Sequence, residues 1–279
     1  MAVSRSGYYN WSAGKSFVQS TEKRRRAEKV KRIFYRHRRR YGSRRIKAQL
    51  CDEGEKMGRY QIRSLMKAEN LEAIRAKRFV PRTTDSKHKS LASPNLLKSE
   101  DNQPVEKGQM IIGDITYLPL SNGRWCYLAI WQDKFTRRIV GWAVGARITD
   151  DLVIVAFEKA VRSGQVKRGA IVHTDRGSQY VSKDFRRLLK KQGLRQSMSA
   201  KGNCYDNAQA ESFFSRFKTE LVEDGLFDGV EQARSEAFSY IEGYYNRIRK
   251  HSSLGYKSPL EFEEELRKKK ERTRVSFVS

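Results

Sequence analysis

The sequence predicts an α/β catalytic domain, a mixed sheet covered by helices, that follows a basic, all-helical region. Three observations predict this arrangement. The first third of the chain places apolar residues at helical spacing and holds most of the excess positive charge. The middle contains three strand-like runs separated by turn signals, and helical and strand-like segments then alternate. Such alternation is typical of a sheet flanked by helices.

The composition indicates a polyanionic partner. The net charge is +26 over 279 residues, and +18 of it falls in residues 1–91, so we expect a nucleic acid rather than a membrane as the partner. No run of 18 apolar residues and no apolar leader is present, which argues against membrane spanning and secretion. Three widely spaced cysteines argue against a disulfide framework or a zinc site and fit a cytoplasmic, nucleoid-associated protein.

Residues 1–75 are predicted to form a basic region that resembles a helix-turn-helix, with residues 59–69 as its second helix. Its apolar stripes are Val30, Ile33 and Phe34, then Ile46 and Leu50, then Ile62, Leu65 and Met66. The DNA-facing candidates on the second helix are Arg59, Gln61, Arg63 and Lys67. The alternative is a solvated basic hairpin that reads no sequence.

The remaining chain is predicted to contain a linker at 76–108, a catalytic core at 109–223 and a C-terminal helical extension at 224–279. Within the core, strands are expected at 109–120, 124–135, 137–147, 169–174 and 194–198, and helices at 150–162 and 182–192. Pro259 is expected to start the last helix.

Three carboxylates are candidates for one catalytic site. Asp114 lies inside the first apolar strand, where a charge is costly unless it is paired or binds metal. Asp175 closes the fourth strand, in HTDRG. Glu211 lies beside the phenylalanine stripe of a following helix and can lean toward both aspartates if the two strands are neighbours. Three acids without a histidine–cysteine set favour Mg²⁺, or Mn²⁺, and two such ions can promote an in-line phosphoryl transfer.

Other polar residues near these acids have competing interpretations. Lys218, seven positions after Glu211, could steady a phosphate or be a solvated lysine. Asn203 and Tyr205 lie in a polar stretch suited to contact DNA. Asp206 is expected to cap the following helix, and Glu220 at its far end is expected to be exposed to solvent.

Two residues near the acids and one cationic run are expected to have supporting roles. His173 is expected to be structural, since two-metal chemistry needs no histidine base. For Asp133 a turn or ion-pair role is favoured over contact with the site. The cationic run in YNRIRKHSSLGYKSP is expected to contact the DNA backbone.

Sixty residues separate Asp114 from Asp175, and 35 separate Asp175 from Glu211. This D,D(35)E spacing resembles the integrase core of bacterial insertion-sequence transposases, specifically the second reading frame (OrfB) of the insertion-sequence-three family. The blocks that carry the resemblance are GDITYLPL, YLAIWQDKFTRRIVGWAV, HTDRGSQYVSKDF, SMSAKGNCYDNAQAESFFSRFKTEL and YNRIRKHSSLGYKSPLEFE. SRSGYYNW and YGSRRIKAQL extend it over nearly the whole chain. Ile112, where many members carry an aromatic residue, and the run AIWQDKF are departures that leave the acids unaffected.

The resemblance implies a ribonuclease-H-like fold with a five-stranded sheet and a two-metal strand-transfer reaction at transposon ends. It assigns Asp114, Asp175 and Glu211 as metal ligands. Family members often act as frameshift fusions, so a first-frame (OrfA) partner or fusion is expected. The resemblance also implies homo-oligomers on double-stranded DNA, both at the transposon ends and at the target. The alternatives are a DNA-binding regulator with an inactive nuclease-like core and a retroviral-type integrase. The integrase needs a zinc domain of two His and two Cys, and residues 1–75 offer only His37 and Cys51. A plain ribonuclease H would lack the basic helical region.

Overall fold

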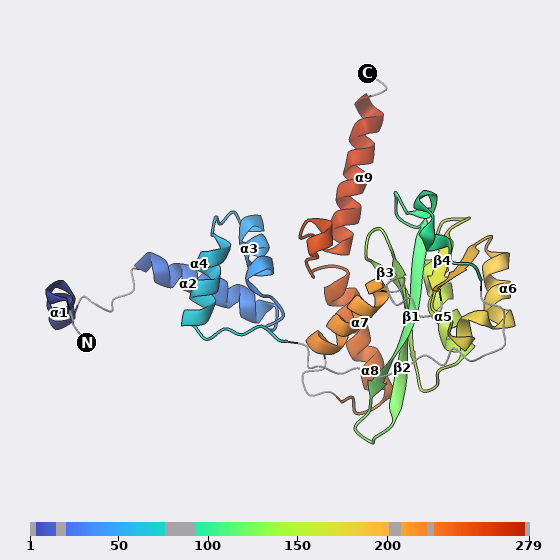
Figure 1. The fold of residues 1–279 in the computed structure, drawn as a ribbon, viewed down its shortest axis with the longest axis horizontal. Coiled ribbons are helices and arrows are strands. Elements are labelled where there is room, and N and C mark those ends of the chain that lie inside the picture. Colours follow the sequence, from blue (N-terminus) through green and yellow to red (C-terminus); the bar gives the residue numbers. More distant parts are fainter. Residues whose placement is uncertain (1–3, 15–20, 76–92, 201–207, 222–225, 277–279) are drawn as a thin grey trace. The chain divides into compact units, whose positions relative to one another are not determined.

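The computed structural model describes residues 4–14, 21–75, 93–200, 208–221 and 226–276. The chain divides into two compact units, residues 1–75 and 76–279, and each unit is described by itself. Figure 1 shows their elements coloured along the sequence. In the described ranges, no helix is long and apolar enough to cross a lipid bilayer.

The first unit is entirely helical. Its helices are α1 (Arg5–Ser12), α2 (Thr21–Arg36), α3 (Ser43–Asp52) and α4 (Arg59–Ala68). Every residue of the three predicted apolar stripes is buried, and these stripes form the core that α2, α3 and α4 share. The loop between α3 and α4 turns at Gly54, whose φ of 78° belongs to the left-handed region that glycine adopts without strain.

The second unit contains a five-stranded mixed sheet in the order β3-β2-β1-β4-β5. The strands are β1 (Met110–Pro119), β2 (Trp125–Asp133), β3 (Ile139–Gly145), β4 (Ile171–Thr174) and β5 (Arg195–Met198). β1, β2 and β3 pair antiparallel, whereas β4 runs parallel to β1 and β5 runs parallel to β4. The predicted fold class, a mixed ribonuclease-H-like sheet flanked by helices after a helical region, is confirmed.

Helices cover both faces of this sheet (Figure 1). One face packs against α5 (Asp150–Arg162) and α6 (Lys183–Lys191), around the fully buried Trp131. A Cβ atom on Gly113 would lie 2.2 Å from the Trp131 ring, so the residue before Asp114 has to be glycine. The opposite face packs against α7 (Ala208–Leu221) and α8 (Val230–Phe238).

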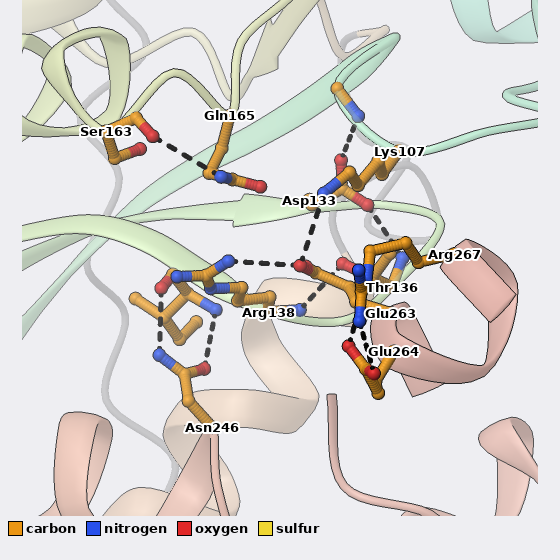
Figure 2. A network of polar contacts seen from close by, with 12 residues as sticks. Lys107, Asp133, Thr136, Arg138, Ser163, Gln165, Asn246, Glu263, Glu264 and Arg267 are labelled. Atoms are coloured by element: carbon orange, nitrogen blue, oxygen red, sulfur yellow. Dashed lines mark hydrogen bonds and ion pairs between the residues drawn. The ribbon is translucent and has the colours of Figure 1, made fainter. Parts of the chain in front are cut away.

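The C-terminal residues complete the core around α7. α8 continues into a π-helical segment, Ser239–Tyr245, whose Tyr240, Ile241 and Tyr245 are buried beside the phenylalanines of α7. α9 (Pro259–Ser276) then begins at the predicted proline. Asn246 holds the edge strand β3 through hydrogen bonds with both the backbone N–H and the carbonyl of Ile139, each 3.0 Å long (Figure 2).

Residues 93–108, at the end of the predicted linker, lie against the five-stranded sheet. The Leu96 N–H donates to the Ser197 hydroxyl at 2.9 Å, and the Ser93 hydroxyl donates to Gln196 at 2.7 Å. Both partners lie on β5, so this segment covers the strand at that edge of the sheet.

The prediction that Glu220 is exposed was wrong. Glu220 is buried near the end of α7, where its carboxylate accepts hydrogen bonds from Arg249 Nε at 2.9 Å and from Arg249 Nη2 at 2.6 Å. The Tyr240 hydroxyl also donates to it, at 3.0 Å. The cationic run expected to contact DNA is also partly internal, because Arg249 and Lys250 are buried while Arg247 is exposed.

Candidate active site

The strand register places the two aspartates at the same level of the sheet. β1 pairs in parallel with β4 from Met110–Ile171 to Ile112–His173. Asp114 and Asp175 each follow the last of these pairs by two residues. Because side chains alternate along a strand, Asp114 projects from the same face as Ile112, the face covered by α7. Both aspartates therefore follow the paired part of β1 and β4 at the same level, and they are close enough for the charge of Asp175 to act on Asp114.

Glu211 approaches this edge from the first turn of α7. The position of the helix follows from its apolar residues, since Ala210, Phe213, Phe214 and Phe217 are buried against the sheet face that carries Ile112. Glu211 itself is exposed, between the buried Ala210 and the phenylalanines. Partial desolvation raises its pKa above the ordinary value for a glutamate.

The electrostatics of Asp114 link the three carboxylates. Burial raises its pKa well above the ordinary value, and the negative charges of Asp175 and, more weakly, Glu211 raise it further. A hydrogen bond of 2.9 Å from the Ile115 N–H and the charge of Lys218 oppose this shift. Asp175 and Glu211 thus disfavour the ionised form of Asp114, a cost that a bound cation would relieve.

The donor set suits a hard cation, because all three groups offer carboxylate oxygens. In the described part of the chain, no group of three or more His, Cys, Asp or Glu side chains is arranged as a finished metal site. The backbone brings Asp114, Asp175 and Glu211 toward one edge without closing them into a coordination cage.

The loop after β4 fixes the orientation of Asp175. The Gly177 N–H donates to Asp175 Oδ1 at 2.9 Å. A Cβ atom on Gly177 would lie 3.1 Å from the same oxygen and 2.8 Å from Gln179 Oε1, so a side chain there would crowd the carboxylate. Arg176 turns away and donates to the Ser199 carbonyl at 2.9 Å. In the sequence DRG, Asp175 therefore provides the carboxylate, Arg176 anchors the loop to the Ser199 carbonyl, and Gly177 allows the tight turn.

Tyr180 is a nearby residue that the sequence analysis did not single out. It is buried behind the aspartates, and burial, followed by the charges of Asp114 and Asp175, raises its pKa well above that of a free tyrosine. The available signal was its place in SQYV, directly after the loop that carries Asp175.

Lys218 lies on α7 on the side of the carboxylates. Its ammonium is 4.9 Å from the centre of the Tyr117 ring, within the range of a cation–π contact. Desolvation lowers its pKa, and the charge of Asp114 partly offsets that effect. Lys218 is thus half-buried against β1, unlike a freely solvated lysine.

His173 and Asp133 have structural surroundings. His173 is fully buried, with Nδ1 2.9 Å from the Ser197 hydroxyl and Nε2 3.2 Å from the Ser199 hydroxyl. The Asp133 carboxylate accepts from the N–H groups of Gly108 and Thr136 at 2.6 and 2.7 Å, so it organises the turn after β2.

The DNA-facing candidates of the first unit lie on the outer side of α4. Arg59, Arg63 and Lys67 are exposed and Gln61 is half-exposed, whereas Ile62, Leu65 and Met66 face the core. Tyr60, which is 86% exposed at the start of this helix, was not among the candidates. Asn203, Tyr205 and Asp206 lie outside the described residues.

Family models match both units of the chain. The HTH-like domain matches residues 21–79, and two models of the integrase core domain match residues 104–204 and 192–259. The fold and these domains define a DDE-type DNA transposase, a polynucleotidyl transferase.

Relatives over almost the full length give the family. The chain is 40% identical over 245 residues to the transposase of insertion sequence element IS904 from Lactococcus lactis, covering 88% of this chain and 96% of the relative. It is 37% identical over 265 residues to transposase InsF of IS3 from Escherichia coli, covering 94% and 91%. The chain belongs to the IS3 family of insertion-sequence transposases. Among solved structures, it is similar to the HTLV-2 integrase catalytic core in complex with magnesium, with a TM-score of 0.46, 16% identity, and coverage of 57% of this chain and 99% of that one.

Proposed function

We propose that this transposase cleaves and joins DNA strands at the ends of its insertion sequence, with Asp114, Asp175 and Glu211 as the metal ligands. The observation that carries the proposal is the parallel register of β1 and β4, which sets the two aspartates at one level. The influence of both other acids on the pKa of Asp114 supports a shared site. Two Mg²⁺ ions, or Mn²⁺, held there would stabilise the attacking and leaving oxygens of an in-line phosphoryl transfer.

The residues around the acids would orient the ligands and the strand. Gly177 holds one oxygen of Asp175 through its N–H and so fixes the orientation of the carboxylate. Lys218, half-buried and close to Asp114, is placed to contact a phosphate oxygen of the reacting strand. The packing of α7 on the sheet fixes the turn that presents Glu211.

We further propose that α4 reads base edges through Arg59, Gln61, Arg63 and Lys67, and that Asn203 and Tyr205 contact DNA near the catalytic site. The proposal for α4 is supported by the buried core of α2, α3 and α4, which leaves the polar side of α4 exposed. The proposal for Asn203 and Tyr205 rests on the sequence alone. Action as a homo-oligomer on DNA and with a first-frame partner belongs to the same proposal, and rests on the family.

The test is metal-dependent nicking and joining of a duplex that carries the DNA flanking this gene. Asp175→Asn and Glu211→Gln should each reduce both products by roughly 100-fold or more while DNA affinity stays near the wild-type value. Asp184→Asn, an exposed residue paired with Arg187, is the matched control and should retain activity. Wild-type protein that binds this DNA but yields no product with Mg²⁺ or Mn²⁺ would favour the regulator with an inactive core.

A further inference from the structure

A pocket of about 410 Å³ lies beside the proposed metal site. Its apolar wall includes Leu97 and Ile112, its cationic wall is formed by Lys134 and Arg137, and the first turn of α7 adds Gln209 and Ser212. Volumes of this size accommodate a nucleotide-sized ligand, and the mixture of an apolar wall with convergent polar groups is typical of binding sites.

The position of the pocket relates it to the carboxylates. Ile112 precedes Asp114 by two residues on the same face of β1, a distance of about 7 Å along a strand. Ser212 directly follows Glu211 on α7. A ligand in the pocket would therefore be next to a group bound at the acids without sharing their oxygens.

Arg137 is the pocket residue whose surroundings most clearly indicate a bound ligand. It is half-buried, and within the described residues its guanidinium makes no hydrogen bond or ion pair. Burial lowers its pKa, which indicates incomplete solvation of the charge. A partly desolvated guanidinium is stabilised by a planar pair of acceptor oxygens, which a phosphate provides. Lys134, whose ammonium donates to the Gln103 amide at 2.9 Å, adds a second cation to the same wall.

The backbone of Arg137 gives a second, independent indication. Its φ is 64°, in the left-handed region, where glycine is free of strain and arginine is not. The surrounding turn enforces this conformation, because Asp133 organises the turn and the Gln132 amide donates to the Arg137 carbonyl at 2.8 Å. An arginine at a position suited to glycine is explained if its side chain is used.

The neighbouring Arg138 differs from Arg137, because its guanidinium has a carboxylate partner. Arg138 donates to Glu263 of α9 at 3.0 Å and so ties the turn to the C-terminal helix (Figure 2). Gln209 donates to the Asp133 carbonyl at 3.2 Å, which links the turn to α7. The wall that carries Arg137 is thus anchored on two sides, whereas the Arg137 guanidinium has no hydrogen bond or ion pair to the residues that the structure describes.

We propose that this pocket binds the nucleotide next to the reacting phosphate on the DNA strand, with Arg137 and Lys134 holding its phosphate. The Ser212 hydroxyl can add a hydrogen bond, and Leu97 and Ile112 can pack against the sugar. The assignment rests on the proposed function of Asp114, Asp175 and Glu211. It adds a phosphate-binding subsite formed by the turn between β2 and β3.

The experiment measures binding of a duplex that carries the DNA flanking this gene, with each phosphate near the cleavage point replaced in turn by a neutral methylphosphonate. Binding is measured in EDTA, so that the result does not depend on catalysis. For the wild type, neutralising one phosphate beside the reacting one should weaken binding about tenfold. Arg137→Gln should bind the unmodified duplex about tenfold more weakly and lose no further affinity on that replacement.

Arg124→Gln is the matched control, because Arg124 is exposed at the opposite end of β2 and the charge change is identical. It should keep the full penalty for the neutral phosphate. Arg137→Gly guards against misfolding, since glycine suits the positive φ, and it should retain or raise the Tm while reproducing the binding defect.

The proposal is overturned if Arg137→Gln and Arg124→Gln respond alike at every phosphate position, or if the Arg137 variants lose affinity for a free mononucleotide but not for the duplex. Asp175→Asn separates this question from the chemistry. That variant should show the wild-type pattern of phosphate positions in EDTA whether or not the carboxylates prove to be catalytic.

Discussion

Asp114 has surroundings that disfavour its own charge. Burial and the two nearby acids raise its pKa, so the folded protein binds this proton more tightly than the unfolded chain does. The ionised carboxylate therefore reduces the stability of the metal-free fold. This loss grows as the pH rises from the ordinary aspartate pKa toward the raised one, and it is complete above the raised value.

We expect Asp114→Asn to stabilise the metal-free protein at neutral pH while abolishing catalysis. Each kcal/mol gained would raise the Tm by roughly 2–4 °C for a domain of this size. Thermal unfolding between pH 4 and 8 in EDTA measures the effect, and the gain should shrink toward acidic pH. Added Mg²⁺ should raise the Tm of the wild type but not of the variant. A variant less stable than the wild type at pH 8 would contradict this account.

Residue-level prediction from sequence succeeded where the chemistry is local and failed where it depends on distant partners. The spacing and apolar flanks of Asp114 and Asp175 indicated strand positions, and the structure places them at one level. Glu220 was predicted to be exposed because it falls at the far end of its helix. Its partner Arg249 is 29 positions away, and no local sequence pattern indicates that the two residues pair.

At the level of elements, α7 connects the catalytic edge to the C-terminal residues. Its start carries Glu211, and its end carries Glu220 in the buried ion pair with Arg249. Burial alone would lower the pKa of Arg249, but hydrogen bonding to Glu220 and its charge raise it overall. Both charges are therefore held by each other rather than by water.

Arg249→Met should destabilise the protein by about 3–5 kcal/mol, because it leaves Glu220 buried without its cation. Replacing both residues by methionine should restore most of the loss, since a buried ion pair and a well-packed apolar pair have similar net stability. Urea unfolding of the single and double variants measures the coupling. Equal losses in the single and double variants would show that the pair is not the source of the effect.

The helix α4 allows base reading to be separated from general charge. Gln61→Ala and Arg63→Ala should lose discrimination between the element's own ends and random duplex, by roughly 1–3 kcal/mol for each lost base contact. Arg24→Gln is the control for charge, because it is exposed, whereas Lys29 and Lys31 pair with Glu55 and Glu69. It should weaken both DNAs alike. Competition binding at one salt concentration distinguishes the two roles. Equal losses of affinity for both DNAs in the α4 variants would show that this helix contacts only the phosphate backbone.

The elements themselves were largely predictable from sequence. The strand runs and helical stripes correspond to β1–β5 and to α2–α6, because apolar periodicity and turn residues are local signals. The sequence did not predict that β4 lies beside β1, and the convergence of the acids was expected only if these strands were neighbours. Strand order depends on packing between distant segments, which local patterns do not specify. The turn carrying Arg137 was interpreted as a connection only, because its left-handed backbone and the pocket that Arg137 lines become visible only in three dimensions.

At the scale of the molecule, positive charge and carboxylate chemistry lie in different units. The first unit holds most of the excess charge, and the second holds the candidate metal ligands. We therefore expect removal of residues 1–75 to weaken DNA binding and to flatten its dependence on salt. The slope of log affinity against log salt should fall by about 0.9 for each lost phosphate contact. An unchanged slope would assign the main DNA interface to the second unit.

The dependence of α7 on residues 227–245 bears on the fate of damaged copies of the element. A stop codon between α7 and α8 would remove Tyr240, Ile241 and Tyr245, expose the phenylalanine face, and leave a product destined for proteolysis. A stop just after Arg75 would instead release a compact basic fragment without any of the acids. Such a fragment would keep α4, the helix proposed to read the terminal sequences. If α4 does read them, the fragment would occupy the ends without cleaving them, and the position of the stop codon would determine whether a truncated product is only degraded or also inhibits intact copies of the element.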